Sequence, residues 1–377
     1  MVQPIPYGHQ SIDESDVAAV AAALRGEWLT TGPSVAAFET EIAATAGTDD
    51  AVAVTSGTAA LHAAYAAAGV ASGDQVIVPA LTFAATASTA SLLGAEIVFA
   101  DVEEDTGNID PEAVASLTTD RTAVVSAVDY AGHPADIDAL LPVARAAGAL
   151  VLEDAAHSIG STFRGRPVGS LADLTTFSFF PTKNMTTAEG GAVVSNSAAL
   201  TAAARAFRGH GLVRDRAEQR YPDEGPWHQE IHQLGLNYRL PDVLCALGIN
   251  QIRRLAEFKA SRTAVFERYQ EGLSDLDGLT LPTKRSAVDP MWHLFPVRVH
   301  DGRRREVFDR LRAEGILVQV NYIPVYWHPY YEDLGYRRGL CPVAERYYSE
   351  EISLPMYAHL DTGDQDRVID ALRSILA

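Results

Sequence analysis

Short apolar segments alternate with alanine-rich amphipathic segments along the first 200 residues. The apolar segments, which the pattern predicts to be strands, are 51–54, 76–78, 97–100, 123–128, 150–153, 174–180 and 192–195. The segments with helical spacing are 11–25, 35–46, 57–68, 84–93 and 137–147. Apolar strands that alternate with helices are typical of a mainly parallel sheet covered on both faces. The pattern therefore predicts an α/β fold.

The remainder of the chain follows a different pattern. Residues 211–235 carry glycine, proline, tryptophan and many charges with little periodicity, which predicts a long loop. A helical stretch at 241–273 is predicted to connect two lobes. The elements predicted after it are strands at 293–299 and 317–320 and helices at 304–314, 342–350 and 364–376. We therefore expect a large domain at 1–250, with an N-terminal arm at 1–10, and a smaller α/β domain at 251–377.

Composition and charge exclude several classes of function. Acidic residues outnumber lysine and arginine 49 to 30, for a net charge of −19, which repels nucleic acid and anionic membrane surfaces. The cysteines, Cys245 and Cys341, are too far apart to indicate a disulfide framework or a zinc site. The N-terminus lacks the pattern of a signal peptide, and no uncharged apolar run reaches about 18 residues. We expect a cytoplasmic protein without a metal.

Lys183 stands out because it follows an apolar strand that stops at Pro181, and because Gly190 and Gly191 then allow a new strand to begin. An amine held just beyond a buried strand can be desolvated and form Schiff bases with aldehydes. The alternative is a solvated loop lysine.

Two further features fall at predicted strand ends. Gly57 and Thr58 open a helix after the first strand, where free N–H groups suit a phosphate, although residues of this kind are also ordinary helix caps. Asp154 ends another strand and could hold a ring nitrogen protonated, or it could cap a turn. His157, close behind, is a cofactor contact only if Asp154 is functional, and otherwise is a packed core histidine.

Together with Ser178 as a second phosphate ligand, these residues form the set that pyridoxal 5'-phosphate (PLP) requires: a phosphate anchor, a partner for the ring nitrogen and an amine. Competing motifs such as GxGxxG after a strand, GxxxxGK[ST] and GxSxG are absent from the sequence.

Several runs resemble the DegT/DnrJ/EryC/StrS sugar aminotransferases, which are PLP enzymes. These runs are TSGTAALH (55–62), GDQVIVPALTF (73–83), EDAAHSIGS (153–161), FSFFPTKNMTTAEGG (177–191) and LGLNYRL (234–240). The family resemblance implies the three-layer fold of PLP-dependent transferases, similar to aspartate aminotransferase, with a mostly parallel central sheet and a smaller C-terminal α/β domain.

Within the family, the chain is most similar to the C4 aminotransferases that make the UDP-4-amino sugar precursor of pseudaminic acid. The runs behind this are WLTTGP (28–33), VDYAGH (128–133), GILVQVNYIPVY (315–326) and EISLP (351–355). His157 also fits, because many other members carry glutamine there. Phe180 replaces a common histidine and Ala188 stands where glycine is frequent, and Phe180 puts the sugar fit in doubt.

The resemblance implies a role for each matching residue. Lys183 would form the Schiff base and then move a proton, and Asp154 would pair with the ring nitrogen. The remaining expected contacts are His157 and Phe83 on the ring, Gly57, Thr58 and Ser178 on the phosphate, and Asn237 from the neighbouring subunit of a homodimer. Weaker candidates for sugar or nucleotide contacts, for which ordinary packing is an equal alternative, are Tyr7, Thr30, Tyr322 and His328.

The resemblance also implies the substrates. L-Glutamate would donate its amino group, and a nucleotide-linked 4-keto-6-deoxy sugar, with UDP favoured over dTDP, would accept it at C4. Alternatives that the sequence leaves open are a dTDP-linked 4-keto sugar, a 3-keto sugar, a cyclitol ketone and a non-catalytic regulatory protein that kept the fold. The dehydratase branch of the family typically has histidine where this chain has Lys183.

Overall fold

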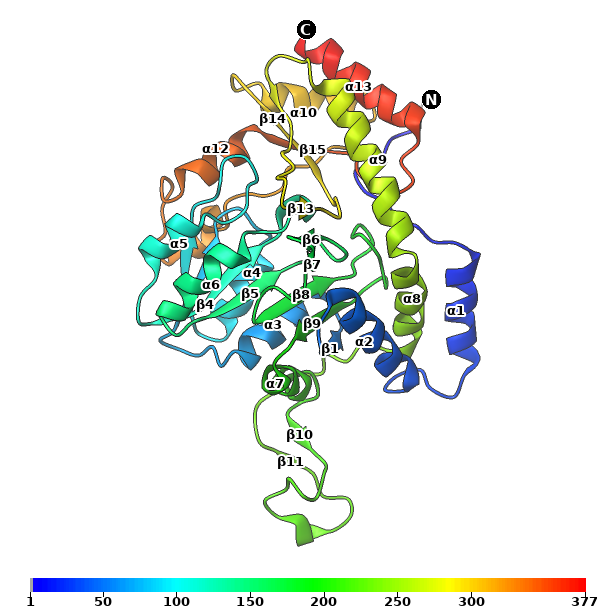
Figure 1. Cartoon of the computed structure of the whole chain (residues 1–377), viewed down its shortest axis with the longest axis vertical. Coiled ribbons are helices and arrows are strands. Elements are labelled where there is room, and N and C mark those ends of the chain that lie inside the picture. Colours follow the sequence, from blue (N-terminus) through cyan, green and yellow to red (C-terminus); the bar gives the residue numbers. More distant parts are fainter. Residues whose placement is uncertain (1–2) are drawn as a thin grey trace.

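A seven-stranded sheet forms the centre of the computed structural model, which describes residues 3–377 (Figure 1). In the order β1-β9-β8-β5-β4-β2-β3, its strands are Asp50–Val54, Gly191–Ser195, Leu174–Ser178, Leu150–Asp154, Thr122–Val128, Gln75–Pro79 and Glu96–Ala100. Neighbours from β8 to β3 pair in parallel, whereas β9 is antiparallel to β1 and β8. The mainly parallel sheet predicted from the sequence is confirmed.

Alternate residues of the strands enter two different cores. Ala51 and Ala53 of β1 belong to one hydrophobic cluster, whereas Val52 and Val54 belong to another on the opposite face. Since both faces are buried, most strand residues are apolar or small, which explains the apolar runs in the sequence. The central sheet is therefore the middle of three layers.

Helices cover both faces of the sheet and build the rest of the chain. In the described residues they are α1 (Glu14–Arg25), α2 (Pro33–Ala46), α3 (Gly57–Ala67), α4 (Ala85–Leu92), α5 (Pro111–Leu117), α6 (Ile137–Ala146), α7 (Ala198–Arg208), α8 (Asp242–Arg253), α9 (Leu255–Leu273), α10 (Arg304–Ala313), α11 (Pro329–Asp333), α12 (Pro342–Glu350) and α13 (Thr362–Leu376). None of them is long and apolar enough to cross a membrane.

A third hydrophobic cluster gathers the C-terminal part of the chain. It combines residues between Val265 and Ile375 with Ile5 of the N-terminal segment. A three-stranded antiparallel sheet lies within this part and consists of β12 (Leu279–Thr280), β14 (Phe295–Val299) and β15 (Glu351–Leu354). A separate core supports the expected smaller domain, whose boundary near residue 250 stays a prediction.

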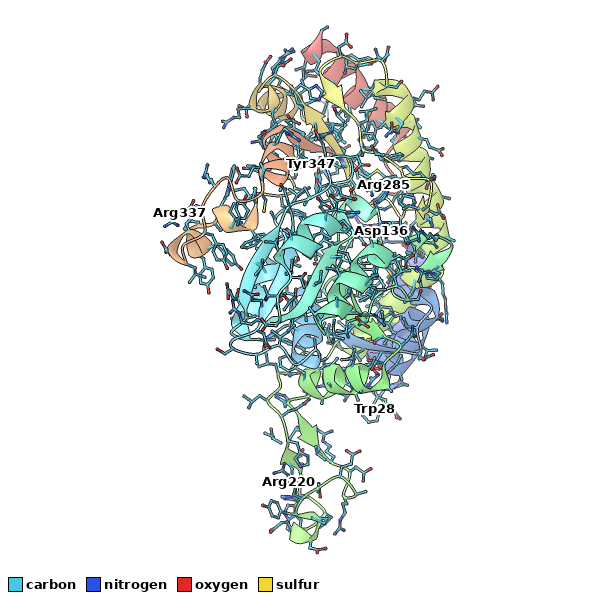
Figure 2. All side chains as sticks on the ribbon, turned by 60° about the vertical axis from the view of Figure 1, so that its left-hand side comes forward. Trp28, Asp136, Arg220, Arg285, Arg337 and Tyr347 are labelled. Atoms are coloured by element: carbon cyan, nitrogen blue, oxygen red, sulfur yellow. The ribbon has the colours of Figure 1, made fainter. Side chains whose placement is uncertain are left out.

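A hairpin projects from the body below α7 (Figures 1 and 2). Its strands are β10 (Leu212–Val213) and β11 (Glu230–Ile231), and Arg220 lies in the projecting part. The side chains of Trp227 and Leu234 are 79% and 88% exposed. The predicted loop at 211–235 thus contains a short hairpin with apolar side chains in solvent.

Some predicted elements differ from the structure. The helix expected at 241–273 is two helices that meet at Arg254, and the strand expected at 174–180 ends at Ser178. The strand expected at 317–320 is wrong, because this segment makes isolated bridges, at Ile316 and Gln319, instead of a continuous ladder. Its apolar residues are buried through packing in the C-terminal core, so burial alone produced a strand-like pattern.

Glu39 ties α2 to β1 and α7. Its carboxylate accepts hydrogen bonds from Ala53 N–H at 2.9 Å, Arg208 Nη1 at 2.5 Å and Arg205 Nη1 at 2.7 Å. The residue is 8% exposed, so the ion pairs operate with little solvent screening on the carboxylate side. This network fixes two helices against an edge strand of the sheet.

We predict that Glu39→Gln lowers the free energy of unfolding by about 2 kcal/mol, because Arg208 loses its carboxylate partner and Arg205 keeps only its pair with Asp50. Denaturant titration measures the change. The control is Glu41→Gln on the same helix, whose exposed pair with Arg253 is worth less than about 1 kcal/mol. Equal stability of the two variants would contradict the prediction.

Candidate active site

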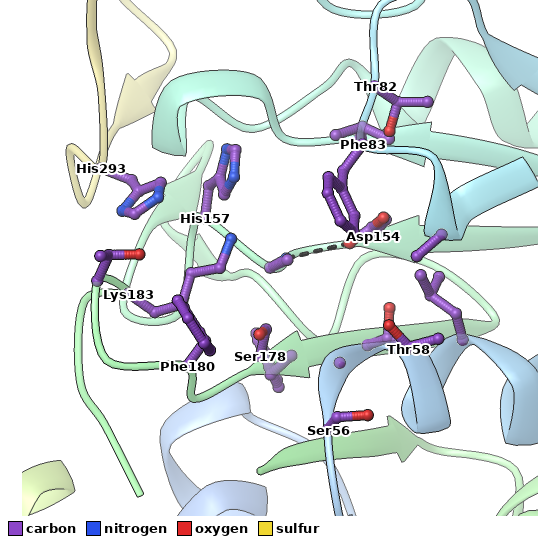
Figure 3. A pocket seen from close by; sticks show the side chains of 18 of the residues that line it. Ser56, Thr58, Thr82, Phe83, Asp154, His157, Ser178, Phe180, Lys183 and His293 are labelled. Atoms are coloured by element: carbon purple, nitrogen blue, oxygen red, sulfur yellow. Dashed lines mark hydrogen bonds between the residues drawn. The ribbon is translucent and has the colours of Figure 1, made fainter. Parts of the chain in front are cut away.

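A cavity of about 600 Å³ opens at the carboxyl ends of the parallel strands. Val128, Asp154 and Ser178, the last residues of β4, β5 and β8, line it together with the start of α3. Figure 3 shows Lys183, His157 and His293 at one side, with Asp154, Phe83 and Thr58 farther along. Ligands of open α/β sheets bind at this edge.

The start of α3 and the end of β8 approach each other closely on the floor of the cavity. Ser56 caps the helix by accepting a hydrogen bond from Ala59 N–H at 3.1 Å. A Cβ added to Gly57 would lie 2.8 Å from Cβ and 2.9 Å from Oγ of Ser178, and one added to Gly191 would lie 2.4 Å from the Ser56 carbonyl oxygen. Glycine at both positions therefore allows the start of α3 to lie this close to β8 and β9. The cavity lies against this helix N-terminus, which is a favourable place for an anion.

Asp154 is the last residue of β5 and is 5% exposed. One carboxylate oxygen accepts from Thr86 Oγ1 at 2.7 Å and the other from Ala156 N–H at 3.3 Å. Burial raises the pKa of Asp154, whereas the hydrogen bond from Thr86 and the charge of Lys183 lower it. These contacts hold the carboxyl group in place facing the cavity.

Lys183 lies in the turn after β8, where its backbone N–H donates a hydrogen bond to the Phe180 carbonyl oxygen at 2.8 Å. Burial lowers the pKa of Lys183 to about 8, and the negative charge of Asp154 acts in the opposite direction. A lysine with such a pKa is partly neutral near physiological pH and can act as nucleophile and base.

Aromatic rings form the wall beside the amine. His157 is buried, its Nε2 lies 3.1 Å from the Tyr322 hydroxyl, and its ring centroid lies 4.3 Å from that of His293. Burial and the charge of Lys183 lower the pKa of His157 well below its usual value, so the ring is neutral. Phe83 meets Tyr322 edge to face at 6.0 Å and exposes 60% of its surface.

The structure brings most of the predicted site residues together. Those that line the cavity are Tyr7, Gly57, Thr58, Phe83, Asp154, His157, Ser178, Lys183 and Tyr322. Three others do not line it in the described chain: Thr30 and Asn237 are exposed, and His328 lies half-buried at the start of α11. Asn237 was expected to act on the neighbouring subunit, and its role stays a prediction, as do those of Thr30 and His328.

Sequence reasoning missed several residues of the site. Thr86, the second residue of α4, donates a hydrogen bond to Asp154, and His293, Asn321 and Glu189 line the cavity. The pattern predicted a strand at 293–299, which begins with His293. A single histidine among apolar residues does not indicate which residues lie beside it in the fold. The contact between Thr86 and Asp154 could not be inferred from sequence spacing, because 68 residues separate the two.

The two departures from the family pattern have different structural consequences. Ala188 has φ of 66°, a left-handed conformation that favours glycine, which explains why glycine is frequent there. Phe180 lines the cavity with 45% of its surface exposed, so part of its side chain is accessible to solvent. Among residues 3–377, no group of three or more histidine, cysteine or acidic side chains could hold a metal.

Comparisons with known proteins agree with this geometry. A protein of *Bacillus subtilis* described as spore coat polysaccharide biosynthesis protein SpsC is 38% identical, over 99% of this chain and 97% of its own. The UDP-4-amino-4,6-dideoxy-N-acetyl-beta-L-altrosamine transaminase of Campylobacter jejuni is 36% identical, also over 99% of this chain and 97% of its own.

Solved structures share the fold. Spr1654 from Streptococcus pneumoniae in its PLP form superposes with a TM-score of 0.91 at 28% identity, covering 99% of this chain and 98% of that one. The model of the DegT/DnrJ/EryC1/StrS aminotransferase family matches residues 10–373, nearly the whole chain. The strand-end cavity with its lysine and aspartate, the sequence matches and the shared fold lead to one conclusion: this chain belongs to the DegT/DnrJ/EryC1/StrS aminotransferase family.

Proposed function

We propose that the protein is a PLP-dependent aminotransferase that moves an amino group from L-glutamate to C4 of a UDP-linked 4-keto-6-deoxy sugar. The observation that carries the proposal is the convergence of Lys183, Asp154 and the Gly57–Ser178 contact on one cavity of about 600 Å³. The transaminase from Campylobacter jejuni supports the choice of a UDP-linked sugar.

The residues of the cavity fit PLP. The part of the cavity lined by Gly57, Thr58 and Ser178 suits the phosphate, because it lies at the N-terminus of α3, where a helix favours an anion. The buried carboxylate of Asp154 suits a protonated ring nitrogen, and neutral His157 suits one face of a flat ring. When bound, PLP supplies an aldehyde that takes up amino groups and a ring that withdraws electrons from the reacting carbon.

The chemistry of the protein then rests on proton movement by Lys183. The amino group leaves C2 of glutamate, which takes its keto oxygen from a water molecule and becomes 2-oxoglutarate. The same amino group arrives at C4 of the sugar, whose ketone oxygen leaves as water, so no net water is consumed. Lys183 removes the proton from C2 of glutamate and delivers one to C4 of the sugar. A pKa of about 8 suits both tasks, because the amine accepts and releases protons near neutral pH.

Charges in the cavity are few, so the walls restrict the substrate mainly by shape. Among the described residues, its charged lining side chains are Asp154, Lys183 and Glu189. Tyr7 and Asn321 add hydrogen-bonding groups, and Asn321 Nδ2 donates to the Tyr7 hydroxyl at 2.7 Å.

We also propose a homodimer with shared active sites. The projecting hairpin exposes Trp227 and Leu234, which is an apolar surface that a second copy of the chain would cover. Asn237 follows the hairpin and is itself exposed, so it is available to another subunit's phosphate site. The hairpin thus offers a means for one subunit to complete the site of the other.

We predict that Lys183→Ala lowers the transamination rate by more than about a thousandfold, because no other residue can relay the proton. Formation of 2-oxoglutarate from glutamate measures the rate. Lys284→Ala, at an exposed lysine outside the cavity, is the control and retains activity. Full activity of Lys183→Ala would refute the assignment.

We predict that Gly57→Ala weakens PLP binding by at least about tenfold, because the new methyl group collides with Ser178 and fills the phosphate opening. Absorbance titration of the cofactor-free protein gives the dissociation constant. Gly26→Ala, at the end of α1, where the nearest atom would be 3.3 Å away, should bind PLP as the unmodified protein does. Unchanged affinity in Gly57→Ala would show that the phosphate lies elsewhere.

The sugar is identified by a panel of UDP- and dTDP-linked 4-keto and 3-keto sugars, mixed with PLP, glutamate and the protein. We expect a 4-amino sugar from a UDP-linked substrate, detected by mass spectrometry and NMR. Product from dTDP-linked sugars alone would reject the UDP assignment. Absence of bound cofactor, with no spectral change on adding glutamate, would instead favour a non-catalytic protein.

A further inference from the structure

Two carboxyl groups are buried together at the ends of neighbouring strands of the central sheet. Glu153 of β5 and Asp129, the residue after β4, are both 0% exposed. Glu153 pairs in register with Ala127, so Asp129, two residues farther along the chain, lies on the same face of the sheet. Asp154 lies on the other face, where it lines the cavity. The pair therefore lies beside the cavity without facing it.

The hydrogen-bond donors around these two acids are uncharged. They are Ala135 N–H at 2.9 Å and Ser158 Oγ at 2.5 Å from Asp129, and Thr175 Oγ1 at 3.0 Å and Gly169 N–H at 3.3 Å from Glu153 Oε2. The other oxygen of Glu153, Oε1, is buried and has no hydrogen-bond partner in the part of the chain that the structure describes. Leaving a buried carboxylate oxygen without a donor is costly, so Oε1 requires a proton from another source.

The pair also lacks a cationic partner within residues 3–377. The charge of Arg166 lowers the pKa of Glu153, but Arg166 is exposed and pairs with Asp138. Burial raises the pKa of both buried acids, and the charges of Glu153 and Asp154 raise that of Asp129 further. A hydrogen bond with Asp129 acts in the opposite direction on Glu153. Two carboxyl groups that contact each other in a low-dielectric interior do not both ionise at neutral pH.

We propose that Asp129 and Glu153 share one proton at neutral pH, and that this proton joins the end of β4 to β5. The proton lies between Oε1 of Glu153 and the carboxyl group of Asp129, so the unpartnered oxygen gains a hydrogen bond. Through Ser158, Asp129 also holds the segment after Asp154, in which His157 lines the cavity. The two acids are thus positioning residues. Neither cofactor nor substrate takes part in this contact, which stands apart from the proposed function.

Infrared spectroscopy detects the shared proton directly, because the C=O stretch of a protonated carboxyl group is separate from that of a carboxylate. Subtracting the spectrum of Glu153→Gln from that of the unmodified protein at neutral pH should leave one such band, since the new amide donates to Asp129, which then ionises. Asp129→Asn should remove the same band. Burial raises the pKa of Glu351 to about 8, so that acid contributes a band of its own, which cancels in the difference.

We predict that the unmodified protein loses stability relative to Glu153→Gln as the pH rises. The folded pair keeps a proton that the unfolded chain releases above the ordinary pKa of glutamic acid, so a rising pH favours unfolding until the pair itself ionises. The ratio of the unfolding constant of the unmodified protein to that of Glu153→Gln should increase at least about tenfold between about pH 5 and about pH 8. Urea titrations followed by tryptophan fluorescence measure both constants.

The matched control is Glu39→Gln, the same substitution at a buried glutamate that pairs with Arg205 and Arg208. This variant should be less stable than the unmodified protein at both pH values, and it should keep the carboxyl band. Its behaviour separates the loss of a shared proton from the loss of a buried carboxyl group in general.

The outcomes decide between a shared proton and two separate acids. Persistence of the carboxyl band in Asp129→Asn, or a ratio of unfolding constants that does not change with pH, would overturn the proposal. Should Glu153→Gln fail to fold, the infrared spectrum of Asp129→Asn decides: loss of the band supports the shared proton, and its persistence refutes it. Neither measurement uses transamination, so failure of the proposed function would leave these results unaffected.

Discussion

Withdrawal of the Lys183 amine from water is the condition on which the site depends. The amine extends from a turn at the end of β8, where strand and turn bring it under the aromatic walls of the cavity. A lysine in solvent holds its proton at physiological pH, whereas burial lowers the pKa of this one to about 8. The three-layer fold provides this burial because both faces of the sheet are already covered, which leaves the strand ends as the place where a cavity forms.

The charges at the cavity are mixed in sign, whereas the chain as a whole carries a net charge of −19. Lys183 and the N-terminus of α3 contribute positive charge, and Asp154 and Glu189 contribute carboxyl groups. Screening limits the effect of distant surface charge to about 8 Å at physiological ionic strength. Anionic substrates therefore respond mainly to the nearby groups, and the acidic surface principally keeps the protein in solution.

Sequence reasoning was successful where chemistry is local and periodic. Strand periodicity identified the sheet. Because parallel strands bring their carboxyl ends to one edge, the sequence also placed Asp154, Ser178 and Lys183 close together, and all three line the cavity; their roles stay predictions. Sequence reasoning failed where contacts span the chain. Thr86 reaches Asp154, and Arg262 reaches the Lys183 carbonyl, only because helices far away in sequence pack there. Burial also produced strand-like patterns without a strand, as at 317–320.

The close approach of Gly57 to Ser178 has a consequence for how related sequences can vary. Since a Cβ at position 57 would lie within 3 Å of Ser178, a side chain at position 57 requires the loss of the one at position 178. The two positions must therefore change together, although one opens a helix and the other ends a strand far along the chain. In an alignment of relatives, residues 57 and 178 should therefore change together. We expect a relative with a substitution at only one of these positions to have lost the proposed anion site at the helix N-terminus.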